Sequence, residues 1–373
     1  MSSSIPGSRI VYLDVLRVLA TFMVIMVHVG DTFIYNSETM TFGFESSIIA
    51  VLLRSSVPLF IIMSSILLLP IKTDNTTFFK RRFTRVVIPF LGWSMIYVFL
   101  PVPGKLAFGG PANVFTDSGM NVYLYNLMMI PINFTASNAH FWFIYIILGL
   151  YLFMPILSPW IKTASKKALL FFIVLWGITL FFPYVRLYFP EIQGESDWNS
   201  FGMFYYFGGY LGYVILGYYL HHYNRLSRMN SMLIGALLFI LGVVITYWGF
   251  ISDQQAFLNK LAASNIEDWK GIEFNINFLS PNVVIMTAGV FMMFQNMRLS
   301  GIKQRIIREL SILSYGIFLV HYIICLWLGF WLPGVMDLNP GLEQYIIAVF
   351  TFFISYGIVK ILSFISGSKY IIG

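Results

Sequence analysis

Apolar runs of about 18 to 25 residues recur along this chain of 373 residues, and a helix needs about 20 apolar residues to cross a bilayer. Ten membrane spans are predicted, near residues 10–34, 46–70, 86–103, 141–160, 167–185, 203–221, 229–250, 276–297, 310–332 and 343–365. The alternating pattern of a transmembrane barrel is absent. The expected fold class is therefore an all-α integral membrane bundle of about ten helices.

Composition excludes a large soluble domain. Hydrophobic residues make up 58% of the chain and charged residues only 10%, whereas soluble domains contain about 25% charged residues. The mean hydropathy is +0.78. We therefore expect residues 1–373 to form a single transmembrane domain.

The distribution of Lys and Arg predicts the orientation. With both termini in the cytoplasm, the outer loops contain only Lys105, Arg186, Lys260 and Lys270 of the 23 basic residues, as expected if basic loops stay inside. The short apolar stretch 121–133 must then not cross, so 104–140 is predicted to be one outer segment with a re-entrant or surface helix. The net charge of +7 then reflects topology and contact with anionic membrane lipids, and needs no nucleic acid.

The first span contains ionisable residues, which are costly inside a membrane and are therefore candidates for function. Arg17 and His28 are eleven residues apart, so on a helix they share one face, about 16 Å apart along the axis. Asp14 could pair with Arg17, and Asp31 could hold the ring of His28. A structural ion pair and an interfacial histidine would leave the same pattern.

Three arginines, Arg81, Arg82 and Arg85, come at the inner start of the third predicted span. Guanidinium groups bind phosphates through paired hydrogen bonds, so the cluster could bind a cytoplasmic cofactor such as coenzyme A. Ordinary anchoring by basic residues is the alternative.

Arg54, His140 and His321 are three further candidates. Arg54 lies within the second span and needs an internal partner or an aqueous cavity. His140 opens the fourth span at the outer interface, and His321 lies in the ninth, where it could simply bridge two helices. No metal-ligand spacing occurs and Cys325 is the only cysteine, so neither a metal nor a permanently bound cofactor is expected.

Five elements resemble the membrane-bound acyltransferase family 3. They are LDVLRVLATFMVIMVH, RSSVPLFIIMSSILLL, RRFTR followed by VVIPFL, HFWFIYIILGLYLFMPIL, and SYGIFLVH. The first matches the family's Arg–His spacing in the opening helix, and the order of the five agrees over nearly the whole chain. One departure is Ser64-Ser65-Ile66, where the family often has Ser-Gly followed by Tyr or Phe.

The resemblance implies a multi-pass enzyme of a bacterial cell membrane, in the single-domain branch that includes surface-polysaccharide O-acetyltransferases. Such an enzyme takes an acyl group, with acetyl expected, from cytoplasmic acyl-CoA as co-substrate to a hydroxyl of an outward-facing polysaccharide or glycolipid. Direct transfer and an acyl-enzyme intermediate both stay open. An exporter of a glycan or glycolipid is the alternative class, and a membrane sensor or scaffold is a third.

The resemblance also implies roles for individual residues. His28 would be the general base and Asp31 would orient it, while Arg17, with Arg54, would stabilise the acyl-donor end or the developing oxyanion. The coenzyme A phosphates would bind Arg81, Arg82 and Arg85. The acceptor would contact His140, Trp142 and His321.

Overall fold

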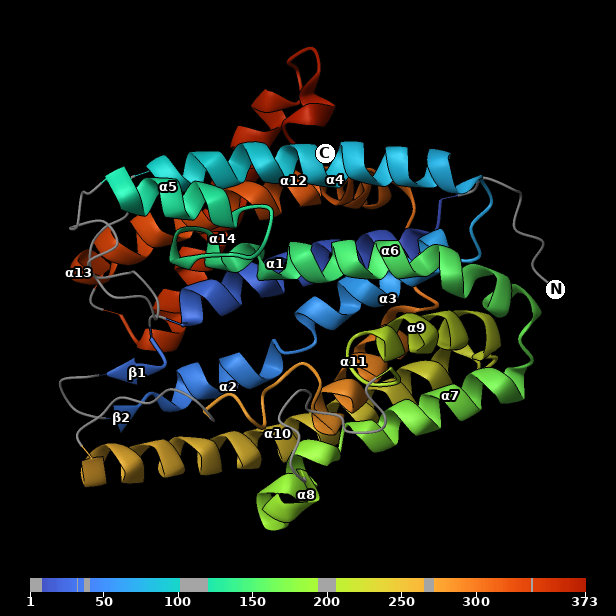
Figure 1. Ribbon diagram of the computed structural model, residues 1–373. Coiled ribbons are helices and arrows are strands. Elements are labelled where there is room, and N and C mark those ends of the chain that lie inside the picture. The colour runs from blue at the N-terminus through green and yellow to red at the C-terminus, as the bar shows by residue number, and fades with distance from the viewer. Residues whose placement is uncertain are drawn as a thin grey trace.

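The computed structural model describes residues 9–31, 33–36, 41–100, 120–193, 206–264, 272–336 and 338–373. In these ranges the chain is a helical bundle with one short antiparallel hairpin, in which Tyr35 pairs with Phe42 (Figure 1). The elements are α1 (Val11–Gly30), β1 (Tyr35–Asn36), β2 (Thr41–Phe42), α2 (Phe44–Leu52), α3 (Ser56–Leu68), α4 (Asn75–Phe99), α5 (Met120–Met129), η2 (Ala136–Phe141), α6 (Trp142–Thr163), α7 (Lys166–Thr179), α8 (Phe182–Tyr188), η3 (Pro190–Gln193), α9 (Leu211–Tyr223), α10 (Arg228–Ser264), α11 (Pro281–Phe294), α12 (Gly301–Trp331), α13 (Pro333–Met336), α14 (Pro340–Leu362) and η5 (Ser368–Tyr370).

Seven segments in the described ranges are long and apolar enough to cross a membrane, so the protein is a multi-pass membrane protein. They are Val11–Gly30, Phe44–Leu68, Asn138–Thr163, Lys166–Tyr188, Arg228–Ala263, Gly301–Trp331 and Pro340–Leu362. Three other predicted spans fall on α4, which begins with a basic segment, and on α9 and α11, which have 13 and 14 residues. The total of ten spans and the cytoplasmic location of both termini stay predictions.

Helix α1 lies at the centre of the bundle and packs against α3, α12 and α14. Its residues Leu16 and Ala20 belong to one core cluster, with α3, α6 and α9, while Ile25 and Val29 belong to another, with α12 and α14. The helix is continuous because its sequence is mostly apolar and contains no internal proline. Side chains on α1 are therefore surrounded by other helices.

The second predicted span, 46–70, is broken in the middle. Helix α2 ends at Leu52 and α3 begins at Ser56. Pro58 has no amide hydrogen, so the carbonyl of Arg54 lacks its helical donor four residues later. The amide of Arg54 bonds the carbonyl of Val51, only three residues back, and the local tightening separates the two helices.

Helix α5 covers much of the predicted non-crossing stretch. It has ten residues and is about 15 Å long, half of the hydrocarbon thickness. The hydroxyl of Tyr145 in α6 donates a hydrogen bond to the carbonyl of Ile130, just after α5. Residues 101–119 lie outside the described residues, so the outer location of 104–140 stays a prediction.

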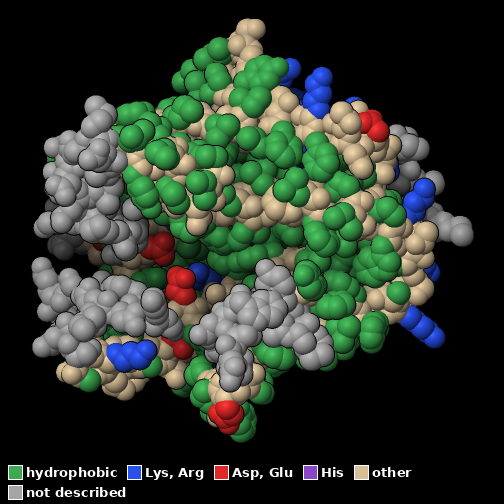
Figure 2. All heavy atoms as spheres, viewed as in Figure 1, with side chains coloured by type: hydrophobic (Ala, Val, Ile, Leu, Met, Phe, Trp, Pro, Cys, Tyr) green, Lys and Arg blue, Asp and Glu red, His purple; other side chains and the backbone are tan. Residues whose placement is uncertain are grey.

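Charged side chains are unevenly placed on the face seen in Figure 2. Hydrophobic side chains cover most of it, and most of the visible Lys and Arg side chains lie along its upper margin and its right-hand edge. In Figure 1, the turns between α3 and α4 and between α6 and α7 lie at that edge. The same face is hollowed on the left, where acidic and basic side chains are visible between its upper and lower halves (Figure 2).

Candidate active site

Three histidines from separate parts of the chain converge. His28 is in the last turn of α1, His140 is in η2 and His321 is in α12. Their ring centroids are 5.4 Å apart for His28 and His321, 5.7 Å for His140 and His321, and 6.4 Å for His28 and His140. These three residues, with Tyr97 and Tyr322, are named the histidine cluster below.

A capped turn presents His140 to the cluster. The amide of Thr135 donates to the side-chain carbonyl of Asn138 at 2.8 Å, and the amide of Asn138 donates to the carbonyl of Thr135. The His140 ring is 2% exposed and stacks on Tyr322 with centroids 4.4 Å apart. Neither ring nitrogen has a hydrogen-bond partner among the described residues. Such buried polar atoms are rare and call for an explanation.

The environment of His321 fixes its tautomer. Its Nδ1 lies 2.6 Å from the carbonyl oxygen of Phe318, which can only accept, so Nδ1 carries the proton. The buried Nε2 is then an acceptor, and no group in the described part of the chain donates to it. His321 therefore has one free lone pair inside the cluster.

His28 is the most accessible of the three histidines. Its side chain is 15% exposed, and its Nδ1 lies 3.6 Å from the carboxylate of Asp31. This distance is an ion-pair contact and is too long for a strong hydrogen bond. The carboxylate of Asp31 therefore lies on the Nδ1 side of the His28 ring.

Two tyrosines complete the cluster, and the sequence analysis did not find them. Tyr97, which is buried in α4, packs its ring 4.6 Å from that of His140. Its hydroxyl donates to the carbonyl of Leu319 at 3.0 Å and accepts from the amide of Ile323 at 3.3 Å. These two backbone groups flank His321 and are helical partners, so Tyr97 holds the turn of α12 that carries His321.

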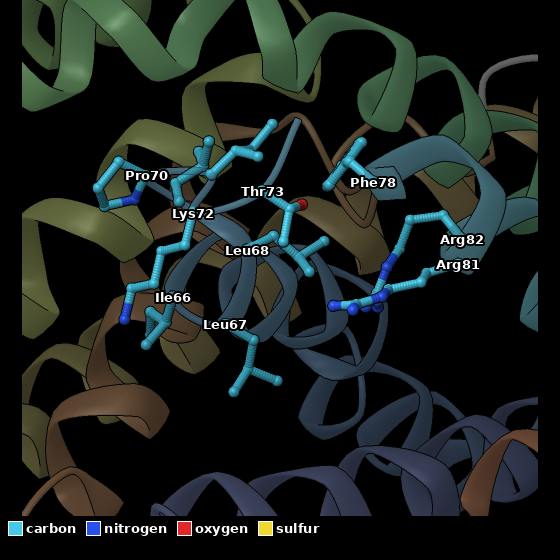
Figure 3. Close-up of a pocket in the computed structure, with 11 residues that line it drawn as sticks. Ile66, Leu67, Leu68, Pro70, Lys72, Thr73, Phe78, Arg81 and Arg82 are labelled. Atoms are coloured by element: carbon cyan, nitrogen blue, oxygen red, sulfur yellow. The ribbon is translucent and has the colours of Figure 1, made fainter. Parts of the chain in front are cut away.

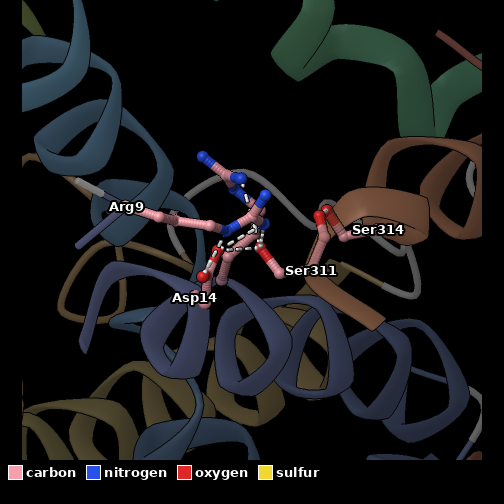
Figure 4. Close-up of polar contacts among 5 residues, drawn as sticks. Arg9, Asp14, Ser311 and Ser314 are labelled. Atoms are coloured by element: carbon pink, nitrogen blue, oxygen red, sulfur yellow. Dashed lines mark hydrogen bonds and ion pairs between the residues drawn. The ribbon is translucent and has the colours of Figure 1, made fainter. Parts of the chain in front are cut away.

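A second polar group, named the arginine network, lies near the N-terminal end of α1 (Figure 4). The guanidinium of Arg9 donates two hydrogen bonds to Asp14, at 2.6 and 2.7 Å. The hydroxyl of Ser311 in α12 donates to Asp14 at 2.6 Å and accepts from Arg17 at 3.2 Å. Asp14 thus pairs with Arg9 rather than with Arg17. Arg9 precedes α1, and its side chain lies close enough to the first turn of the helix to bond Asp14.

Arg17 and His28 face the same neighbour. Arg17 contacts Ser311 and His28 contacts His321, and both partners are on α12. Ten residues separate these partners, which is about 15 Å of helix. Arg17 and His28 thus contact α12 at positions about 15 Å apart along its axis. The role of Arg17 at the acyl-donor end or at the oxyanion stays a prediction.

A pocket of about 170 Å³ lies between the end of α3 and the start of α4 (Figure 3). Arg81 and Arg82 are on one wall and Lys72 is on the other. Arg85 does not line it. Tyr151 of α6 is close enough to Arg82 and Arg17 to interact with both electrostatically, which places this pocket near the arginine network.

Asp74 caps the helix that carries these arginines. Its carboxylate accepts a hydrogen bond of 2.8 Å from the amide of Thr77. Hydrogen bonds from the side chain and the amide of Thr77 lower the pKa of Asp74. The cap fixes where α4 begins and therefore where Arg81 and Arg82 point.

Arg54 and Trp142 lie elsewhere. Nη2 of Arg54 is 3.7 Å from the carboxylate of Glu273, and its guanidinium lies over Phe278. The ring of Trp142 stacks on Phe278 with centroids 5.5 Å apart and an interplanar angle of 22°. Arg54 does not line the pocket with Arg81 and Arg82. It is about 18 Å from that pocket along α3.

Comparison with protein families identifies the chain. The acyltransferase 3 family model, described as an acyltransferase domain, matches residues 10–360. The chain belongs to the acyltransferase 3 family. No curated protein and no solved structure gave a match.

Family membership confirms the predicted family and identifies the protein as a membrane acyltransferase. The predicted roles of single residues in this acyltransferase stay predictions. What the structure adds is their grouping. His28, His140 and His321 come together, Arg17 and Arg82 both lie near Tyr151, and Arg54 and Trp142 both contact Phe278.

No group of three or more His, Cys, Asp and Glu side chains in the described ranges is arranged to hold a metal ion. Tyr97 and Tyr322 gave little sequence signal, because aromatic residues make up 18% of this acyltransferase. Only the position of Tyr322, directly after His321, could have indicated it.

Proposed function

We propose that this acyltransferase moves an acyl group, with acetyl expected, from cytoplasmic acyl-CoA to a hydroxyl of an extracytoplasmic polysaccharide or glycolipid in a bacterial cell membrane. The observation that carries the proposal is the histidine cluster, whose buried ring nitrogens have free hydrogen-bonding capacity. A cationic pocket at the other end of the bundle supports it.

The donor would bind at the N-terminal end of α1. Arg81, Arg82 and Lys72 could neutralise the phosphates of coenzyme A, and Arg85 would act from the surface nearby. Arg17, held by Ser311, would contact the donor deeper in the bundle. The extended arm of the acyl-CoA would then lie along α1 towards His28.

The chemistry would take place at His28. Asp31 lies on the Nδ1 side, so Nε2 would remove the proton from the acceptor hydroxyl as its oxygen attacks the thioester carbonyl. The new C–O bond forms, the C–S bond breaks, and the imidazolium returns the proton to the departing thiolate. In this arrangement Asp31 stabilises the imidazolium during the step.

The acceptor would be held by groups around His28. The Nε2 atom of His321 can accept a hydrogen bond, so it suits a substrate hydroxyl that donates one. His140 has two unpartnered nitrogens and Trp142 follows it by two residues. Direct transfer is the simplest scheme, since one accessible base suffices.

The test uses purified full-length protein in lipid nanodiscs with radiolabelled acetyl-CoA and a polysaccharide extract from the source cells. Label should pass to the polysaccharide, and His28→Ala should lower the rate by about 10²- to 10⁴-fold, the usual contribution of a general base. His222→Ala, an exposed histidine at the end of α9, should behave as wild type.

Other outcomes would overturn the proposal. Passage of unmodified glycan across proteoliposomes, unaffected by acetyl-CoA, would identify an exporter. If the protein keeps its cellular role when Arg17→Ala and His28→Ala are combined, it acts as a sensor or scaffold and not through this site.

A further inference from the structure

Arg54 is poorly satisfied for a buried cation. It is 5% exposed, and its Nε is buried without a partner. A guanidinium has five N–H donors, yet in the described part of the chain its contacts are an ion pair of 3.7 Å to Glu273 and the face of Phe278. Unmet donors at such a site cost free energy unless a ligand or water meets them.

The partner of Arg54 is turned towards solvent. The side chain of Glu273 is 68% exposed, against 6% for Arg54. Its carboxylate can therefore accept hydrogen bonds from a ligand while it neutralises the guanidinium behind it. The pair offers both donors and acceptors with no net charge.

An aromatic surface adjoins this pair. Phe278 lies under the guanidinium and stacks on Trp142, which is only half-buried. Trp142 follows His140 by two residues, so their Cα atoms are at most about 7.6 Å apart. The surface therefore includes a residue that is a near neighbour of His140 along the chain.

We propose that Arg54, Glu273, Trp142 and Phe278 form a subsite for an uncharged pyranose ring of the acceptor. The C–H face of a pyranose is apolar and suits an aromatic plane, while its hydroxyls both donate and accept. A neutral ion pair satisfies such hydroxyls but gives no net attraction to a phosphate or a uronic acid. The proposal rests on the acceptor being a glycan.

The test measures sugar binding directly, by saturation-transfer-difference NMR on the full-length protein in nanodiscs. The probes are the methyl glycosides of glucose, galactose and mannose, each compared with its uronic acid. Wild type should bind at least one neutral glycoside more strongly than its uronic acid. Trp142→Leu should abolish this signal, and Trp142→Phe should retain it, because the aromatic plane remains.

A charge variant makes the proposal specific. Glu273→Gln leaves the guanidinium uncompensated, so the binding ratio should shift by about tenfold towards the uronic acid, the size of one charge-assisted hydrogen bond. Arg298→Ala changes an exposed arginine four residues beyond the C-terminal end of α11, and this variant should bind both sugars as wild type does. Elution as a single species verifies that each variant is folded.

The outcomes separate this proposal from the acyl-transfer proposal, because no donor is present. The subsite is overturned if wild type binds no neutral glycoside, or if Glu273→Gln leaves the ratio unchanged. Sugar binding without transfer of acetyl would instead retain the subsite and overturn the acyl-transfer scheme.

Discussion

The arginine network and the histidine cluster lie against the same face of α1, yet their hydrogen bonds differ. In the network, Asp14 receives hydrogen bonds from Arg9 and Ser311, and Ser311 also accepts one from Arg17. In the cluster, both nitrogens of His140 and Nε2 of His321 have no hydrogen-bond partner within the ranges that the structure describes. A connected network stabilises a fold, whereas unmet buried groups cost about 1–3 kcal/mol each.

The difference assigns distinct tasks to the two ends of α1. Arg9, Asp14 and Ser311 fix how α1 meets α12. The histidine cluster keeps its polar groups free, as an acceptor site must. Substitutions in the arginine network should therefore mainly change stability, and substitutions in the histidine cluster should mainly change activity.

The largest change in stability is expected for Asp14→Asn. It removes the negative charge between Arg9 and Arg17, and breaking a buried ion pair costs about 3–5 kcal/mol. Since Arg9 is 37% exposed, solvent screening reduces the expected loss to about 2–3 kcal/mol. Titration with SDS in mixed micelles measures the free energy of unfolding. If Asp14→Asn lowers this free energy no more than His140→Phe does, the contrast between the arginine network and the histidine cluster is wrong.

Tyr97→Phe should have an intermediate effect. It deletes the hydroxyl between the carbonyl of Leu319 and the amide of Ile323, at an expected cost of about 1 kcal/mol. Because Tyr97 positions His321 rather than contacting substrate, kcat should fall while the KM for acyl-CoA stays constant. Tyr123→Phe, on the neighbouring α5, is the matched control, and an unchanged kcat in Tyr97→Phe would argue against positioning.

His140→Phe should not destabilise the fold. It replaces a ring with two unpartnered nitrogens by an apolar ring of similar shape, so stability should stay level or rise by about 1 kcal/mol. Transfer to the acceptor should fall at the same time. A clear loss of stability in the same SDS titration would show that His140 is structural and that the histidine cluster is not a free binding site.

The smallest effect is expected at Asp74, and it should disappear in acid. Its pKa is lowered in the folded state, so its stabilisation is complete above the ordinary pKa, about pH 4, and is lost as pH falls through the lower folded value. Between pH 5 and 8, Asp74→Ala should therefore be less stable than wild type by a constant amount. Thermal unfolding across pH 3–8 measures this, and a difference that keeps growing between pH 5 and 8, or that does not shrink as the pH falls below 4, would contradict it.

The sequence was most informative where the signal is local. Apolar runs predicted the helices, because crossing a bilayer requires length and hydrophobicity that one segment supplies alone. The spacing of Arg17 and His28 predicted that both face one neighbour, because helical periodicity needs no tertiary contact. The break at Arg54 was missed although Pro58 signals it, since hydropathy averages over such a position.

Which side chains meet in the site depended on packing between residues that are far apart in the sequence. Nothing in the order of residues indicates that Tyr97 inserts its hydroxyl beside His321, or that Arg54 lies over Phe278 and not near Arg82. Periodicity tells which face of a helix is apolar but not which neighbour covers it, because most helices here are apolar on every side. The sequence by itself therefore determined the membrane class, the family and the polar face of α1, while only the tertiary structure decided which polar groups meet and which have no partner.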